Sequence, residues 1–110
     1  MKVKEIVEKL NLEVVIEADL NKKVTGGYTG DLLSNVMAKA KAGNLWITIQ
    51  SHQNVIAVAL LVEISAVIIA EDSSVDDKAK ERAKQKGINI LRSQDNAYQI
   101  AGKMFKEGID

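Results

Sequence analysis

The chain has a single histidine, His52, and it lies among polar residues that could take part in chemistry. Gln50 and Ser51 come directly before it, at a predicted junction between a strand and a helix. A histidine there can act as a general base, accept a phosphoryl group, or bind a metal ion with the acidic residues Glu71 and Asp72. A single histidine at a helix start more often caps the helix or lies on the surface, so both interpretations stay open.

The acidic pair Glu71 and Asp72 also has two interpretations. Its carboxylates could hold a divalent cation. They could equally complement the dipole of the helix that follows, an arrangement that Ser73 and Ser74 also fit. Because the second arrangement is the common one, we predict no metal site and no cofactor.

A glycine-rich segment, Gly26-Gly27-Tyr28-Thr29-Gly30, precedes an apolar pattern with helical spacing. The backbone amides of such a loop can bind a phosphate or carboxylate at a helix N-terminus. The segment lacks the lysine of a phosphate-binding loop and the spacing of a dinucleotide fingerprint. A tight turn with an ordinary helix cap is therefore the competing interpretation.

Composition excludes several functional classes. The 110 residues include 15 Lys and Arg, 15 Asp and Glu, and no Cys, so thiolate catalysis, cysteine-ligated clusters and disulfides are excluded. The balanced charge removes the electrostatic argument for a nucleic acid or a membrane surface as a partner. The apolar run 55–70 contains Glu63 and Ser65 and is shorter than the roughly 20 residues of a bilayer span. With no signal-peptide pattern at the N-terminus, we expect one cytoplasmic domain over residues 1–110.

Helices and strands are predicted to alternate along the chain. The strands are expected over residues 12–16, 45–49, 67–70 and 88–91, and the segment 22–25 could add another. Apolar residues at helical spacing predict helices over 3–11, about 32–40, 51–63, 74–86 and from 95 onward.

Cap residues refine these boundaries. Thr29 or Asp31, then Ser51, and then Ser93 or Asp95 are expected to cap helices at their N-termini. Gly43 and Gly87 are expected to end helices in the left-handed conformation. The last helix is expected to be buried through Ala97, Ile100, Ala101, Met104 and Phe105.

The alternation predicts a three-layer α/β sandwich, with a largely parallel sheet of four or five strands between layers of helices. In such sheets ligands bind beyond the carboxyl ends of the strands. Four polar turns would meet there, at residues 26–30, 50–54, 71–74 and 92–96. The predicted ligand-binding residues are Gly27, Tyr28, Thr29, Gly30, Gln50, Ser51, His52, Glu71, Asp72 and Asp95.

The helix over 51–63 contains eight consecutive apolar residues, Val55 to Val62, so every side of it is apolar. An outer helix of a small three-layer domain normally keeps one polar face. Either other elements of the chain cover this helix or a second copy packs on it. We favour a symmetric homodimer whose interface contains Val55, Val58, Ala59 and Val62.

From Gly43 onward the sequence resembles the DRTGG domain, a small α/β module of bacterial and archaeal regulatory proteins. The matching segments are Gly43-Asn44-Leu45-Trp46-Ile47-Thr48, the apolar helix after Asn54, Ala66-Val67-Ile68-Ile69, Lys86-Gly87-Ile88-Asn89-Ile90-Leu91, and Asp95 with its helix. The first residues, from Val3 to Val14, resemble the opening of the N-terminal domain of HPr kinase/phosphorylase, whose fold is related.

The motif that names the family is replaced in this chain. Ser51-His52 occupies the place of the Asp-Arg pair, and Ala70-Glu71-Asp72 occupies the place of Thr-Gly-Gly. A phosphate site inferred from an arginine and a glycine turn therefore does not transfer, and no G-x-x-x-x-G-K-[ST] loop supports kinase activity.

The resemblance implies an accessory role. We expect a non-catalytic regulatory or adaptor module that binds a partner protein or a small ligand, such as a nucleotide or phosphorylated metabolite, at the carboxyl ends of its strands. Small stand-alone relatives are similar to proteins found beside redox enzymes of anaerobic metabolism, which suggests such an enzyme as a partner in trans. The alternative is a small enzyme or phosphocarrier that uses His52 with Glu71 or Asp72.

Overall fold

The computed structural model describes residues 1–110 and has the expected three-layer α/β architecture. Five strands form one sheet in the order β1-β5-β4-β3-β2. The strands are β1 (Glu13–Ile16), β2 (Gly26–Thr29), β3 (Asn44–Thr48), β4 (Ala66–Ile69) and β5 (Ile90–Arg92). The helices are α1 (Val3–Lys9), α2 (Leu33–Lys39), α3 (Gln53–Val62), α4 (Asp77–Lys86) and α5 (Ala97–Lys106).

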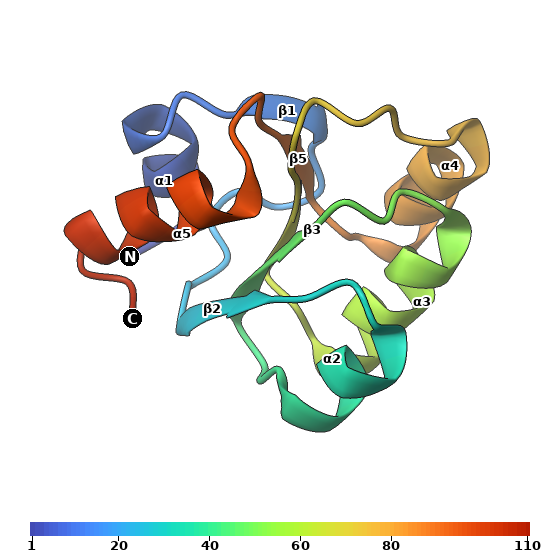
Figure 1. The fold of residues 1–110 in the computed structure, drawn as a ribbon. Helices are drawn as coiled ribbons and strands as arrows, with labels where there is room; N and C mark the ends of the chain where they lie inside the picture. Colours follow the sequence, from blue (N-terminus) through green and yellow to red (C-terminus); the bar gives the residue numbers. More distant parts are fainter.

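Helices cover both faces of the sheet (Figure 1), and each face has its own apolar core. One core lies under α2, α3 and α4 and includes Trp46 and Ile56. The other lies under α1 and α5 and includes Ile6 and Ile100. Strand residues alternate between the two cores: Trp46 belongs to the first, whereas its neighbours Leu45 and Ile47 belong to the second. The residues of β3 and β4 are therefore all buried, as in a strand that has helices on both sides.

The central strands are parallel, as predicted. β2, β3, β4 and β5 run in the same direction, with Tyr28 opposite Trp46 and Trp46 opposite Val67. β1 is antiparallel to β5, and Glu13 lies opposite Arg92 in that pair. The start of β1 therefore lies at the same end of the sheet as the carboxyl ends of the other four strands.

The glycine-rich segment is a strand instead of the predicted turn. Gly26–Thr29 forms β2, which pairs with β3 at one edge of the sheet, and segment 22–25 adds no named strand of its own. Glycine lacks a side chain that favours a strand, but a larger residue at Gly27 would have to displace the end of a neighbouring side chain. A Cβ atom on Gly27 would lie 2.7 Å from Cε of Met104 in α5.

Several helix ends differ from the predicted caps by one or a few residues. His52, not Ser51, caps α3, and Asn96, not Ser93 or Asp95, caps α5. α2 has no side-chain cap, because its N-cap position is Leu32, and Asp31 bonds to the end of β3. Gly43 has the predicted positive φ but lies three residues beyond Ala40, the C-cap of α2, whereas Gly87 ends α4 as predicted.

α3 is covered mainly by its own chain. Val55, Val58 and Ala59, three of the four residues predicted for a dimer interface, are buried in the core, and Val62 is half-buried against it. The apolar residues that α3 leaves exposed are Ala57, Leu60 and Leu61. Packing within the chain, against the sheet, α2 and α4, therefore accounts for the buried part of the all-apolar pattern of this helix.

α5 buries a narrower face than predicted. Ile100 and Met104 lie in the core, and Ala97 and Ala101 are half-buried against it. Phe105, which we expected to be buried, is 66% exposed. It follows Met104 in the sequence, and the 100° turn between successive helix residues moves it away from the sheet.

None of the helices combines the length and the apolar character that crossing a bilayer would require. The apolar run 55–70, the most apolar part of the sequence considered as a membrane span, is divided between α3 and β4.

Candidate functional site

The loops after the parallel strands meet at one end of the sheet, as expected. The amide of Ala70, after β4, donates to the carbonyl of Thr48 in β3 at 2.9 Å. The amides of Glu71 and Asp72 donate to the carbonyls of Asp95 and Ser93, after β5, at 2.9 and 2.8 Å. Residues far apart in the sequence therefore form one continuous edge.

A polar cavity of about 300 Å³ lies at this edge, beside β1 and β5. Its lining comes from the α1–β1 junction, the β4–α4 loop, the end of β5 and α5, and Leu10 is its one apolar residue. The lining residues are Leu10, Asn11, Glu13, Asp72, Arg92, Ser93, Gln94, Asp95 and Lys103. Of the predicted ligand-binding residues, Asp72 and Asp95 line this cavity.

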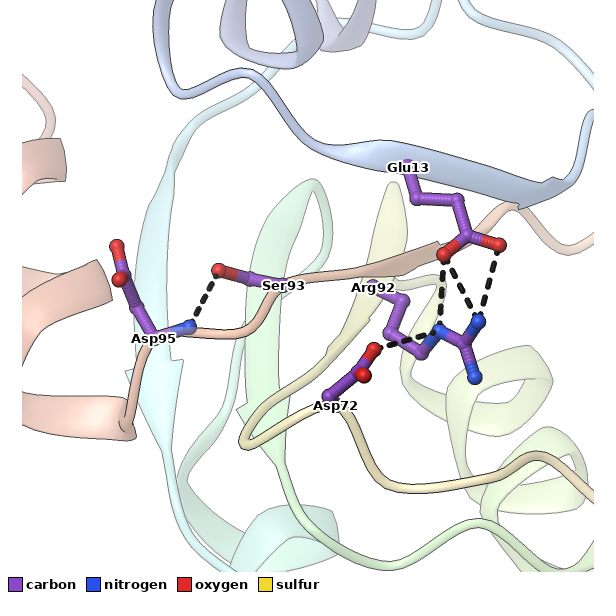
Figure 2. A network of polar contacts seen from close by, with 5 residues as sticks. All are labelled: Glu13, Asp72, Arg92, Ser93 and Asp95. Atoms are coloured by element: carbon purple, nitrogen blue, oxygen red, sulfur yellow. Dashed lines mark hydrogen bonds and ion pairs between the residues drawn. The ribbon is translucent and has the colours of Figure 1, made fainter.

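Arg92 lines the cavity and contacts two carboxylates (Figure 2). Its Nε and Nη2 atoms donate to Oε1 of Glu13 at 3.0 and 2.9 Å, and Nη2 also donates to Oε2 at 3.2 Å. On its other side, Nε lies 3.4 Å from Oδ1 of Asp72. The guanidinium therefore connects β1, β5 and the β4–α4 loop.

The partners of Arg92 are accessible to solvent. The side chains of Glu13 and Asp72 are 54% and 56% exposed, and that of Arg92 is 27% exposed. An exposed pair with a single contact, such as Arg92 with Asp72, contributes only about 0–1 kcal/mol to stability. A ligand can therefore displace Asp72 from Arg92 at small cost, whereas the pair with Glu13 is bidentate.

A second ion pair lies on the opposite wall of the cavity. Nζ of Lys103, from α5, contacts Oδ2 of Asp95. The turn that carries Asp95 is ordered by Ser93, whose Oγ accepts from the amide of Asp95 at 3.0 Å (Figure 2). Asn96 caps α5 by accepting from the amide of Gln99 at 2.9 Å. Because Asn96 is the cap, the carboxylate of Asp95 is free to contact Lys103.

The backbone of Glu71 and Asp72 is left-handed, with φ of 60° and 52°. These two residues occupy the place at which the resemblance puts two glycines. Glycine adopts this conformation without strain, whereas other residues pay roughly 1–2 kcal/mol each. The loop thus keeps a glycine-type backbone while carrying carboxylates, and it directs Asp72 toward Arg92.

The other predicted site residues lie in separate places along the edge. At the ends of β2 and β3, the carbonyl of Gly30 accepts from Nε1 of Trp46 at 2.8 Å, and Nε2 of Gln50 donates to the carbonyl of Asp31 at 3.2 Å. Gly27, Tyr28 and Thr29 instead border a small apolar cavity of about 100 Å³ between β2 and α5. These residues do not line the polar cavity.

His52 serves as a helix cap, the more common of its two interpretations. Its Nδ1 accepts from the amide of Asn54 at 3.3 Å. The carbonyl of Ser51 accepts from the amide of Asp76 at 3.2 Å, which ties the start of α3 to the start of α4. Neither residue lines the polar cavity, and no three His, Cys, Asp or Glu side chains gather closely enough to hold a metal ion.

Sequence reasoning missed the residues that dominate the cavity. Arg92 and Lys103 were not singled out, although residues 92–96 were predicted as one of the turns at this edge. Glu13 could be connected to Arg92 only by knowing that β1 lies antiparallel beside β5. The one available signal was the position of Arg92 at the end of the last apolar strand.

Comparison with known proteins agrees with the fold. No curated protein matches the chain significantly in sequence. A solved structure of similar fold contains the CBS and DRTGG domains of the regulatory region of Clostridium perfringens pyrophosphatase, complexed with the activator diadenosine tetraphosphate. The TM-score is 0.70 with 11% sequence identity, over 94% of this chain and 45% of that one. This chain therefore spans less than half the length of that structure, and the likeness concerns the fold.

The sequence profile of the DRTGG domain matches residues 5–106. That range includes all five strands and nearly all of the five helices. Although the residues that give the family its name are replaced, the chain belongs to the DRTGG domain family.

Proposed function

We propose that this chain is a non-catalytic regulatory or adaptor module of the cytoplasm, which binds a small polar ligand in the cavity around Arg92. The observation that carries the proposal is the cavity itself. It lies at the carboxyl ends of the strands, where α/β sheets bind ligands, and two cations on ordered elements line it.

The lining favours a ligand with both hydrogen-bond acceptors and donors. Arg92 and Lys103 are cations, whereas Glu13, Asp72 and Asp95 are carboxylates. A nucleotide has this mixed character, because its phosphates can replace a carboxylate on Arg92 while its hydroxyl or amino groups donate to the carboxylates. The similar regulatory region was captured with a nucleotide activator, which supports testing nucleotides first.

The test is a thermal-shift screen of the full chain against nucleotides, dinucleoside polyphosphates and phosphorylated metabolites. A ligand at about 100 times its Kd adds about 2.7 kcal/mol to the free energy of unfolding. In a domain of this size that raises Tm by roughly 10 °C. We expect a shift for at least one nucleotide-class ligand.

The two arginines of the chain provide a matched pair of variants. Arg92→Met removes the cation of the cavity, whereas Arg82→Met removes an exposed cation on α4 that does not line the cavity. The ligand-induced shift should disappear in the first variant and persist in the second. A flat screen, or a shift that survives Arg92→Met, would refute the proposed site.

The alternative is a phosphocarrier or small enzyme that uses His52 with Glu71 or Asp72. Its support is that capping engages Nδ1 of His52, which leaves Nε2 available for a phosphoryl group. Incubation with phosphoenolpyruvate or ATP, followed by intact-mass measurement, separates the two proposals. A phosphoryl adduct that is absent in His52→Ala would favour the alternative, and an unchanged mass is expected under the regulatory proposal.

The homodimer predicted from α3 stays a prediction. The surface available for its interface is smaller than predicted, because most of the predicted interface residues are buried in the core. Of its apolar residues, α3 leaves Ala57, Leu60 and Leu61 exposed and Val62 half-buried, so these are the apolar residues available to a second copy. Sedimentation at micromolar concentration should give twice the 12.0 kDa chain mass if the dimer forms. A monomer would contradict the prediction without affecting the cavity.

A further inference from the structure

The outer face of α5 carries two exposed aromatic side chains. Tyr98 is 88% exposed and Phe105 is 66% exposed. They lie seven positions apart, or about two helical turns, and therefore project from the same side of the helix. The opposite side, with Ile100 and Met104, packs on the sheet. An amphipathic helix normally presents polar residues to water, so the packing of the chain itself does not account for these rings.

A glycine lies between the two rings. Gly102 is in the middle of α5, where glycine is less favourable than alanine. Nothing lies within 4 Å of the position that its Cβ would occupy, and its φ is not positive. The fold therefore does not require glycine here, whereas a Cβ on Gly27 would displace the end of the Met104 side chain. The result is an open notch flanked by Tyr98 and Phe105.

The charged residues that line the notch are both lysines. A shallow groove of about 500 Å³ is lined by Tyr98, Gln99, Ala101, Gly102, Lys103, Phe105 and Lys106. Two of these residues are lysines and none is acidic. Lys103 contacts Asp95 in the neighbouring cavity, whereas Lys106 has no ion-pair partner. The groove therefore complements a negatively charged partner.

The two aromatic rings by themselves supply less area than a stable dimer needs. Aromatic side chains bury about 150–250 Å² each, so covering these two rings at their present exposure removes roughly 230–390 Å². A stable dimer buries about 800 Å² on each partner. The rings supply the anchor of a smaller contact, such as one short segment of chain.

From these observations we infer that the outer face of α5 is a docking site for an acidic, amphipathic segment of a partner protein. An aliphatic or aromatic side chain of that segment enters the notch over Gly102, between Tyr98 and Phe105. Its carboxylates contact Lys106 and Lys103. The inference does not depend on a ligand in the cavity, although Lys103 lines both places.

The test is selection from a display library of random short peptides on the immobilised full chain. We expect enrichment of sequences that combine carboxylates with large apolar residues. The selected peptide is then labelled, and its Kd is measured by fluorescence anisotropy against the full chain. A synthetic version with Lys in place of Glu and Asp should not bind.

Three variants locate the contact. Gly102→Leu fills the notch with a good helix former, and Lys106→Glu reverses the free charge; each should weaken binding about tenfold or more. Lys84→Glu makes the same charge change on the exposed face of α4 and should leave the Kd unchanged. Circular dichroism melts confirm that each variant is folded. All three leave Arg92 in place, so failure of the ligand proposal and failure of this one are distinguishable.

Several outcomes would overturn the inference. One is enrichment of basic peptides, and another is a selection that yields no saturable binder. A third is binding that Gly102→Leu does not weaken. Finally, sedimentation of the unmodified chain as a dimer that Gly102→Leu converts to a monomer would make a second copy the occupant.

Discussion

At the scale of single residues, Asn89 is the polar side chain on which the structure depends most. It is fully buried, and its Oδ1 accepts from the amides of Ala18 and Asp19 at 2.8 and 2.9 Å. Its Nδ2 donates to the carbonyls of Asp19 and Ser65 at 2.8 and 2.9 Å. One amide group thus holds the loop after β1 and the residue before β4 against the start of β5.

Asn89→Ala should therefore lower the free energy of unfolding by at least about 2 kcal/mol, because it leaves several buried backbone groups without partners. Urea denaturation followed by circular dichroism measures the change. Asn21→Ala, at an exposed position in the same loop, is the matched control and should change stability little. Equal stability of the two variants would show that the four bonds contribute nothing net.

Residue-level prediction from the sequence depended on whether the relevant contact was local. Gly87 was predicted correctly because a helix C-cap involves only neighbouring residues. The pairing of Arg92 with Glu13 joins residues 79 positions apart, and no local pattern encodes it. Phe105 was predicted to be buried because it is large and apolar. It is exposed because it follows Met104 by one residue and therefore lies on another side of the helix.

At the scale of elements, the C-caps of α3 and α4 make a direct comparison possible. Glu63 ends α3 with φ of 64° and ψ of 45°, and Gly87 ends α4 with φ of 73° and ψ of 38°. The two backbones are nearly the same, but only glycine adopts this conformation without strain.

We expect Glu63→Gly to stabilise the protein by about 0.5–1 kcal/mol, since relief of strain exceeds the added entropy of the unfolded chain. Gly87→Ala should destabilise it by about 1 kcal/mol. Nothing lies within 4 Å of the added Cβ, so that loss would be conformational. Chemical denaturation measures both changes. A loss of stability in Glu63→Gly would mean that the glutamate side chain contributes more than its backbone strain costs.

The elements that sequence reasoning identified well are those with a local sequence pattern of their own. β3 and β4 are continuous apolar runs, and α4 has acids early, bases late and a terminal glycine. β2 has no such pattern, because Gly26 and Gly27 do not favour a strand. Its structure comes from pairing with β3 and from the close approach of α5, which are tertiary contacts.

At the scale of the whole molecule, the alternation of elements was enough to predict a parallel sheet with its loops at one end. It did not predict the strand order, in which β1 joins the sheet antiparallel beside β5. That feature places Glu13 beside Arg92 at the polar cavity. The strand order also places Asp95, after β5, two strands from His52, after β3, and three strands from Tyr28 in β2, although the sequence had grouped these residues.

The same sheet couples the two apolar cores, and this coupling is testable. Ile6 lies in the core under α1 and α5, whereas Trp46, the one tryptophan, lies in the core on the opposite face. Between them, the residues of β3 and β4 alternate from one core to the other, so neither face can lose its helices without exposing residues of both strands.

We expect Ile6→Ala to lower the free energy of unfolding by about 2–5 kcal/mol, as large-to-small core changes do. Because unfolding should be cooperative, the fluorescence of Trp46 should report the same lowered midpoint as circular dichroism, although the mutation is on the other side of the sheet. Ile56→Ala, in the same core as Trp46, should behave in the same way. If the Trp46 transition stayed at its original midpoint in Ile6→Ala while the circular dichroism transition moved, the two layers would unfold independently. The strands would then not transmit stability between the faces, and ligand binding at one end of the sheet could not be assumed to stabilise the whole domain.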